Sequence, residues 1–434
     1  MKTNNYSLNG HRQDAVTVGS FYLTIVLFNI VDIITSFQLL KGEDFTAGQI
    51  FKGAIFIVLL ILNMRHSHIR GGLFLVLGLL YYFIIVETAN YLFYQYDVKF
   101  LWRGLSFSMK ATLPFMFYFY YVSMCRKGAM NYDVLKRGVY FYVMLFSLNM
   151  IAPAMSGVSR LNYERSGFTG LYYAGNDVGA YLTVTFPIMF YFFLRDAKHR
   201  VLTAILLVLL VISGILTGAK TPLISIMLSV TIIPILLTRN RRRWLFAVPI
   251  LMFGVYVVLM LYGQGLLDYL PRSVYGRLIW TIQTRDSFLD ILLGVRLEYL
   301  AQYIDNIKSK GFFGLLFGNG FVNASTFMYR YTGMYKAAEM DGVDIIARYG
   351  FVGIIIVSSM IYKVLKTHYE PRLELSLIVT YMLCLLVFNA LLAGHVFGNA
   401  FNMLVLGIIL TMNKAEHMVD EGNVQMSKTF DGVA

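Results

Sequence analysis

Ionisable side chains interrupt the apolar segments of this chain. Eight of them lie within such segments or at their ends: Asp32, Lys52, Glu87, Lys110, Asp177, Lys220, Arg348 and His395. An ionisable group in hydrocarbon is costly, and such groups mark water-filled cavities or functional sites. When the segments are threaded through a membrane, all eight fall in the half opposite the cytoplasm. This one-sided placement predicts chemistry at the outer face rather than a pore lined from end to end.

Cations in the outward segments have the chemistry to bind phosphate. Arg160 and Arg165 lie in an outward loop, where positively charged residues are disfavoured, and guanidinium groups bind phosphate oxygens in a bidentate fork. Lys220 precedes Pro222, which suits the first turn of a helix, and an ammonium group beside a helix N-terminus forms an anion site. The alternative for the two arginines is an ordinary solvated loop.

A polar pair, Asn176 and Asp177, enters the sixth apolar segment. A carboxylate at this depth needs a cationic partner, which Arg165 or Lys220 can supply. A purely structural pair between Asp177 and a lysine is the alternative. Further arginines, Arg285 and Arg296 among them, lie in a long outward loop.

Carboxylates gather just before a late apolar segment, at Glu339, Asp341 and Asp344. If a helix begins near Asp341, then Asp341, Asp344 and Arg348 share one face. Acidic side chains also cap helix N-termini, but three carboxylates and an arginine exceed what capping requires. A positioned carboxylate can act as a general base. His395, in the last outward turn, is a further candidate base or else a structural histidine.

The composition is that of an integral membrane protein, because the 434 residues are 58% hydrophobic and only 14% charged, against about 25% charged residues in soluble domains. We attribute the net charge of +13 to basic cytoplasmic loops rather than to nucleic-acid binding. The histidines and cysteines lack the spacing of a metal site, and we predict no metal and no other cofactor. The predicted fold is an all-α polytopic membrane protein of about twelve transmembrane helices. The expected spans are 16–40, 49–64, 71–94, 104–123, 138–156, 172–194, 201–219, 221–238, 244–264, 344–364, 373–393 and 395–413.

Basic residues recur in alternate loops, which places those loops and both termini in the cytoplasm. We expect residues 1–434 to form a single membrane domain. Residues 265–343 form its large outward loop, and residues 414–434 form a flexible polar tail. Within the loop, residues 289–307 have helical apolar spacing and either lie along the membrane surface or cap a cavity.

These residues give the chain a resemblance to the O-antigen polymerases and ligases, polytopic enzymes that act on undecaprenyl-pyrophosphate-linked glycans. The shared architecture is a GT-C-like membrane domain with one large outward loop late in the sequence. The motifs that carry the resemblance are short: Arg160 to Asp177, Thr217 to Lys220, and Glu339 to Gly353. Ligases carry His-Asn where this chain has Glu339 and Met340, so the pattern is more similar to a repeat-unit polymerase of the Wzy type.

The resemblance implies a metal-independent glycosyltransferase that polymerises lipid-linked repeat units into O-antigen, capsule or exopolysaccharide at the outer face of the bacterial inner membrane. Departure of pyrophosphate needs cations, and activation of a sugar hydroxyl needs a base. The candidate bases are Glu339, Asp341 and His395. The residues expected to bind pyrophosphate or glycan are Arg160, Arg165, Asn176, Asp177, Lys220, Arg285, Arg296, Asp344 and Arg348.

The implied partners are lipid-linked glycans, membrane lipids, a chain-length regulator and a flippase, and not nucleic acid. Two other functions stay open. A ligase would transfer the glycan to a lipid or protein acceptor. A flippase would carry the lipid-linked oligosaccharide across the membrane, although such transporters often have two similar halves, and the halves of this chain differ.

Overall fold

The computed structural model describes residues 5–43, 46–66, 70–94, 98–157, 161–163, 166–172, 175–238, 296–309, 311–332, 340–392, 394, 396 and 401–431. The first half of the chain contains α1 (Asn5–Leu40), α2 (Ala47–His66), α3 (Arg70–Tyr94), α4 (Val98–Arg126), α5 (Tyr132–Met155), β1 (Leu161–Tyr163), β2 (Ser166–Phe168), α6 (Gly175–Arg195), α7 (Arg200–Leu216) and α8 (Lys220–Leu236). The second half contains α12 (Arg296–Ser309), α13 (Gly311–Phe317), α14 (Gly320–Thr332), α15 (Asp341–His368), α16 (Glu374–Leu392) and α17 (Phe401–Asp431).

The prediction of an all-helical polytopic membrane protein is confirmed. Among the described residues, seven helices are long and apolar enough to cross a membrane, namely α1, α2, α3, α5, α6, α15 and α16. Helices α7 and α8 are shorter and also apolar. The predicted span 244–264 lies outside the described residues, so the total of twelve stays a prediction.

Helix α17 extends well beyond the span predicted from the sequence. Residues 414–431, expected to form a flexible polar tail, continue α17 as a helix. The first turn of this extension packs against the bundle, since Ala415 and His417 are buried. A helix satisfies the hydrogen bonds of its own backbone, so it can continue through polar residues beyond the apolar core.

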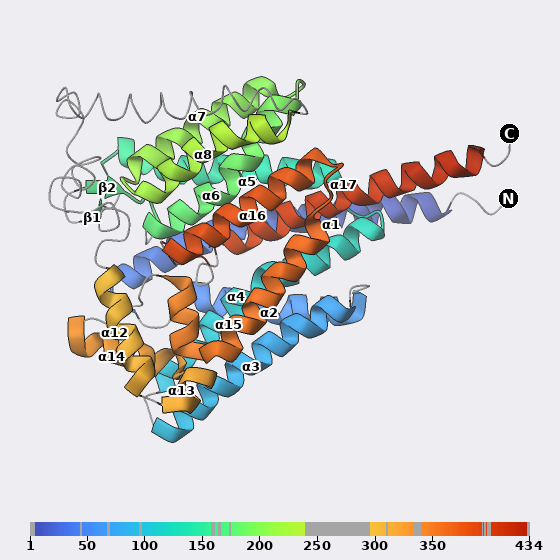
Figure 1. The fold of residues 1–434 in the computed structure, drawn as a ribbon. Coiled ribbons are helices and arrows are strands. Elements are labelled where there is room, and N and C mark those ends of the chain that lie inside the picture. The colour runs from blue at the N-terminus through green and yellow to red at the C-terminus, as the bar shows by residue number, and fades with distance from the viewer. Residues whose placement is uncertain are drawn as a thin grey trace.

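The two ends of the helix bundle differ in what they contain. Helix α1 begins and α17 ends at one end of the molecule, which we call the terminal end (Figure 1). The hairpin of β1 and β2 lies at the opposite end, the hairpin end, together with α12, α13 and α14 (Figure 1). The two strands are antiparallel, with Leu161 opposite Phe168 and Tyr163 opposite Ser166.

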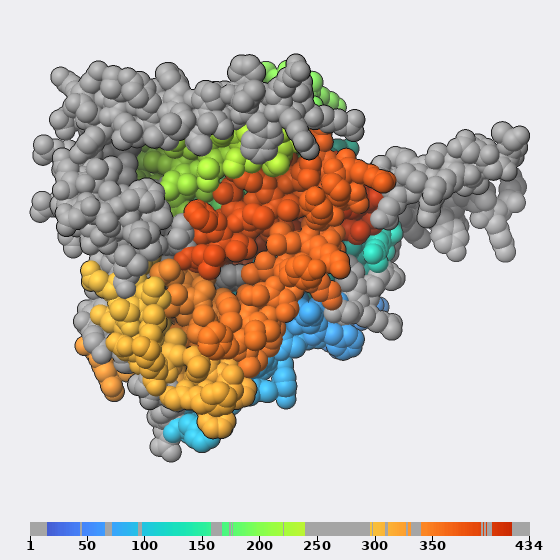
Figure 2. Space-filling view, in the orientation of Figure 1, coloured from blue at the N-terminus to red at the C-terminus, as the bar shows by residue number. Residues whose placement is uncertain are grey.

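Helix α4 occupies the centre of the fold. It packs against α2, α3, α14 and α17, while α6 packs against α7, α8, α16 and α17. Close aromatic contacts fill the space between helices, such as Phe28 with Phe117 and Phe146 with Tyr181, whose ring centroids are 5.5 Å and 3.9 Å apart. Helices α12 to α14 pack on α15 at the hairpin end, where the yellow and orange surfaces adjoin (Figure 2). The fold thus places three loop helices over the start of α15.

Candidate functional site

The start of α15 is shaped by a break in its own helix. Gly350 has a φ of 64°, which interrupts the helical backbone. The break frees carbonyl groups that a regular helix would satisfy. The backbone N–H of Asn319 donates to the carbonyl of Ala347 at 3.0 Å, and the hydroxyl of Tyr82 donates to the carbonyl of Tyr349 at 2.7 Å. Elements distant in sequence therefore hold the kink in place.

Two glycines allow α13 and α15 to approach this closely. A Cβ atom added to Gly350 would lie 2.2 Å from the carbonyl oxygen of Leu316. One added to Gly318, which has a φ of 80°, would lie 2.3 Å from the carbonyl oxygen of Arg348. Only glycine tolerates both the positive φ and the contact. Gly350, part of the motif that carried the family resemblance, therefore has a structural role.

Arg348 lies between two aromatic rings just before the kink. Its guanidinium carbon is 4.9 Å from the ring centroid of Phe107 and 4.6 Å from that of Phe321. Its Nη2 atom lies 3.8 Å from Oδ1 of Asp344, one turn earlier on α15. Both charged residues are about 5% exposed or less, and cation–π contacts are strongest when they are desolvated in this way. Helix α15 begins at Asp341, so the predicted common face of Asp341, Asp344 and Arg348 is present.

Asp341 contacts the last outward turn rather than capping its own helix. The N-cap residue is Met340, which makes no side-chain capping hydrogen bond. Oδ2 of Asp341 instead accepts a hydrogen bond of 2.7 Å from the backbone N–H of Val396. Val396 directly follows His395, the predicted base, which itself lies outside the described residues. Asp341 therefore fixes Val396 to the start of α15.

Glu87 of α3 joins the same group of residues, although it was not among the predicted site residues. Both of its carboxylate oxygens accept from the backbone N–H of Phe321 at the start of α14, at 3.0 Å and 3.1 Å. It also lies close enough to Tyr349 and Arg348 to interact with them electrostatically. A carboxylate at a helix N-terminus is favoured by the helix dipole. Its position within an apolar segment was visible in the sequence, but its partner 234 residues away was not.

Arg296 opens α12, the helix that lies across α15. Arg296, Tyr299, Tyr303 and Ile307 follow one another at helical spacing and share one face of α12. Tyr303 and Ile307 pack in a cluster with Ala347 of α15. Arg296 is therefore on the face of α12 that covers α15. Residues 296–309 are helical, as the apolar spacing of 289–307 predicted for this part of the loop.

Asp177 belongs to a second polar group, which surrounds Lys110 of α4. Asp177 and the ion pair of Asp32 with Lys52 all lie close enough to act electrostatically on Lys110. The Lys52 ammonium is 2.5 Å from Oδ1 of Asp32. The start of α8, where Lys220 lies, is beside Asp177, because a Cβ on Gly179 of α6 would be in contact with Pro222. The predicted phosphate-binding residues thus divide between two places.

Some predicted site residues lie outside the described part of the chain. These are Arg160, Arg165, Arg285, Glu339 and His395, together with the side chains of Asn176 and Lys220. Their roles stay predictions.

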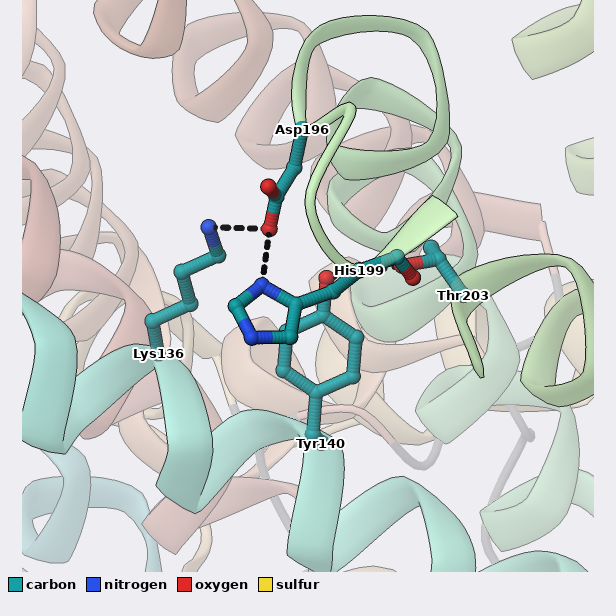
Figure 3. A network of polar contacts seen from close by, with 5 residues as sticks. All are labelled: Lys136, Tyr140, Asp196, His199 and Thr203. Carbon is teal, nitrogen blue, oxygen red and sulfur yellow. Dashed lines mark hydrogen bonds and ion pairs between the residues drawn. The ribbon is translucent and has the colours of Figure 1, made fainter. Parts of the chain in front are cut away.

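The terminal end contains a polar network of a different kind (Figure 3). The ammonium of Lys136 and Nδ1 of His199 both contact Oδ2 of Asp196, at 2.5 Å and 2.9 Å. Beside them, the hydroxyl groups of Tyr140 and Thr203 are 2.8 Å apart. Partial burial alone would raise the pKa of Asp196, but the hydrogen bonds and charges of Lys136 and His199 lower that pKa to about 2. These contacts tie α5 to the connection between α6 and α7.

His368 is an exception to the one-sided placement of buried ionisable groups. Helix α15 continues past residue 364, where the predicted span ended, so that His368 is buried at the terminal end. Its ring packs edge-on to Tyr118, and Nδ2 of Asn413 lies 3.1 Å from its Nδ1. The sequence prediction ended this span at residue 364 and therefore did not include His368.

Comparison with known proteins places the chain in a family. The family described as O-antigen ligase like membrane protein matches residues 17–262, which is more than half of the chain. The chain therefore belongs to the O-antigen ligase-like family of membrane proteins, a part of the O-antigen polymerase and ligase superfamily whose members are associated with glycan transfer. No curated protein and no solved structure matches the chain. The matched residues include Glu87, Lys110 and Asp177, whereas α15 lies beyond them.

Proposed function

We propose that the chain is a glycosyltransferase that polymerises undecaprenyl-pyrophosphate-linked oligosaccharide repeat units at the outer face of the bacterial cytoplasmic membrane. The products would be O-antigen, capsule or exopolysaccharide. The observation that carries the proposal is the buried group of Asp341, Asp344 and Arg348 at the hairpin end, covered by α12 and its Arg296. Buried charges of this kind are costly in an apolar bundle and are typical of functional sites.

The reaction joins a sugar hydroxyl to the growing glycan. The hydroxyl oxygen of the incoming repeat unit attacks the anomeric carbon of the growing chain, and the bond from that carbon to the lipid pyrophosphate breaks. A general base takes the hydroxyl proton. We assign this role to Glu339 first, because it holds the position at which ligases carry a histidine, and to Asp341 second. The contact of Asp341 with Val396 also favours His395 as a neighbouring base.

Cations stabilise the leaving pyrophosphate without a metal ion. Preorganised positive groups lower the energy of the charge that develops in the transition state. Arg296 is positioned for this role by its place on the inner face of α12. Arg165 and Lys220 are the other two candidates. Arg348, which lies between two rings beside Asp344, is a further candidate for binding pyrophosphate or glycan, together with Asp344.

A ligase shares the donor substrate and is the second candidate function. The presence of Glu339 and Met340, where ligases carry His-Asn, favours the polymerase. A flippase is less favoured, because the acidic group lies at one end of the bundle and not near its middle, where transporters bind substrate.

The glycan phenotype of a deletion strain tests the proposed function. A polymerase mutant should display single repeat units on the cell surface, because later transfer steps still operate. A ligase mutant should instead accumulate long lipid-linked chains that do not reach their acceptor. The length and attachment of glycan, read from gel ladders of the deletion strain and of a complemented strain, separate the two outcomes.

A further inference from the structure

Helix α13 exposes apolar side chains, although it belongs to the loop predicted to lie outside the membrane. Phe312 and Phe313 are 68% and 74% exposed, and Phe317 is 45% exposed. No charged residue occurs in the sequence between Gly311 and Tyr329. A cluster of exposed aromatic rings without charges is unfavourable in water and marks a surface that contacts something apolar.

The contact of α13 with α3 indicates the depth at which α13 lies. The two helices meet at the hairpin end, where the carbonyl oxygen of Phe317 is 3.4 Å from the hydroxyl of Tyr82 (Figure 1). Tyr82 is near the midpoint of the apolar span Gly72–Phe93, and the middle of a span is about 15 Å from either surface of the hydrocarbon. Helix α13 has seven residues and is about 10 Å long. Its whole length therefore fits within one half of the hydrocarbon layer.

The chain that follows α13 returns along the same helix. A Cβ atom added to Gly320 would lie 3.0 Å from the side chain of Asn90. The backbone N–H of Phe321 donates to both carboxylate oxygens of Glu87. Glu87 and Asn90 lie about 8 Å and 12 Å beyond Tyr82 along α3. The segment thus follows α3 from its middle toward its C-terminal end.

Protein groups satisfy the backbone of this returning segment. The N–H of Gly318 donates to the carbonyl of Gly314 at 2.9 Å, and the N–H of Asn319 donates to the carbonyl of Ala347 at 3.0 Å. Irregular backbone at membrane depth is tolerated only where protein takes the place of water as the hydrogen-bond partner. The same requirement gives a reason for the carboxylate of Glu87 within an apolar helix.

We propose that residues 311–321 form a re-entrant segment, which enters the membrane from the hairpin end and returns to the same side. Its three exposed phenylalanines contact the acyl chains of membrane lipids. Helix α3 exposes Tyr81 and Ile85 at the same depth, so the apolar face of α13 continues a surface that already faces lipid. The inference does not depend on the reaction that the chain catalyses. It places the kink at Gly350, which packs against α13, within the membrane and not in water.

Collision accessibility of spin labels tests the re-entrant segment. Phe313→Cys is made in the full chain after Cys125→Ser and Cys384→Ser, labelled with a nitroxide and reconstituted into phospholipid vesicles. Oxygen concentrates in hydrocarbon, whereas a nickel chelate stays in water. The label at position 313 should collide more often with oxygen, as should a label at Phe74→Cys on the exposed face of α3. Lys127→Cys, in the exposed turn after α4, should show the reverse.

Two results would overturn the inference. More frequent collision with the nickel chelate at position 313 would place α13 in water. Protection of the label from both reagents would mean that protein, such as a second copy of the chain, covers α13 in place of lipid. Phe312→Cys should give the same result as Phe313→Cys, so the outcome does not depend on one variant. Neither result bears on the polymerase proposal, which the glycan phenotype tests.

Discussion

The hairpin end and the terminal end of the bundle both contain charged side chains, but they arrange them differently. At the terminal end, Asp196 contacts both Lys136 and His199, and Arg195 pairs with Glu374. The side chains of Arg195 and Glu374 are more than 40% exposed. At the hairpin end, the charges are buried and meet aromatic rings, backbone N–H groups or another buried charge, as Arg348 meets Asp344.

The difference indicates where function lies. An exposed ion pair such as that of Arg195 with Glu374 connects elements and contributes little free energy, about 0–1 kcal/mol. Buried charges with incomplete partners are destabilising for an isolated fold and are found where a substrate completes them. We therefore infer that the charged residues of the terminal end have a structural role and that those of the hairpin end bind or convert substrate. Variants at the two ends should differ accordingly in what they damage.

The largest expected effect is that of Gly350→Ala at the hairpin end. A side chain at positive φ costs about 1–2 kcal/mol, and its Cβ would overlap the carbonyl of Leu316. We expect a lower melting temperature and loss of long glycan. Gly78→Ala is the matched control, because no atom lies within 4 Å of its added Cβ and alanine favours a helix. Equal melting temperatures for the two variants would show that the kink is not required.

Loss of the predicted pyrophosphate cations comes next in size. Arg296→Ala, Arg165→Ala and Lys220→Ala should each lower the rate of polymerisation about 100- to 1000-fold, since a preorganised charge is lost from the transition state. Lysine at the two arginine positions should restore activity only in part, because the bidentate fork is absent. The measurement is chain length at matched protein levels. Arg195→Ala, at the terminal end, should leave the ladder unchanged.

Normal-length glycan from all three alanine variants would place the pyrophosphate site elsewhere. It would also remove the functional distinction between the two ends of the bundle.

The smallest effect is expected for Asp196→Asn at the terminal end. The pKa of Asp196 is lowered from 3.8 to about 2, so its contribution to stability is present above about pH 4 and is lost as the pH falls toward 2. At neutral pH the variant should lose up to about 2 kcal/mol of unfolding free energy, because the mostly buried Asp196 carboxylate contacts both Lys136 and His199. Melting temperatures of wild type and variant should converge near pH 2. A constant difference down to pH 2 would contradict the assigned ion pair.

Local patterns in the sequence predicted the helices well. Long apolar runs marked the spans, and the acidic cluster before one of them correctly indicated that α15 begins at Asp341. The polar sequence after Asn413 did not predict that α17 continues as a helix to residue 431. The start of this extension packs against other elements, and such contacts are not visible in the local sequence.

Contacts between distant segments could not be predicted in this way. Nothing near Glu87 in the sequence indicates that its carboxylate meets the N-terminus of α14. The same applies to Asp341 and Val396, which are 55 residues apart. The division of the polar residues into two groups likewise follows from contacts between distant segments, such as that of Lys52 with Asp32. The residue types indicate which side chains could take part in catalysis or binding. Only the fold shows which of these side chains lie in contact.

The acidic group at the start of α15 is the most direct test of the account. Glu339→Gln, Asp341→Asn and Asp344→Asn remove a carboxylate with little change in size, and asparagine caps helices about as well as aspartate. Each variant is expressed at matched levels in the deletion background, beside Asp196→Asn from the terminal end. We expect at least one hairpin-end variant, Glu339→Gln first, to lose long glycan chains, and Asp196→Asn to keep them. Wild-type ladders from all three hairpin-end variants would contradict the catalytic role of these carboxylates and leave them structural contacts of α15, with His395 as the remaining base.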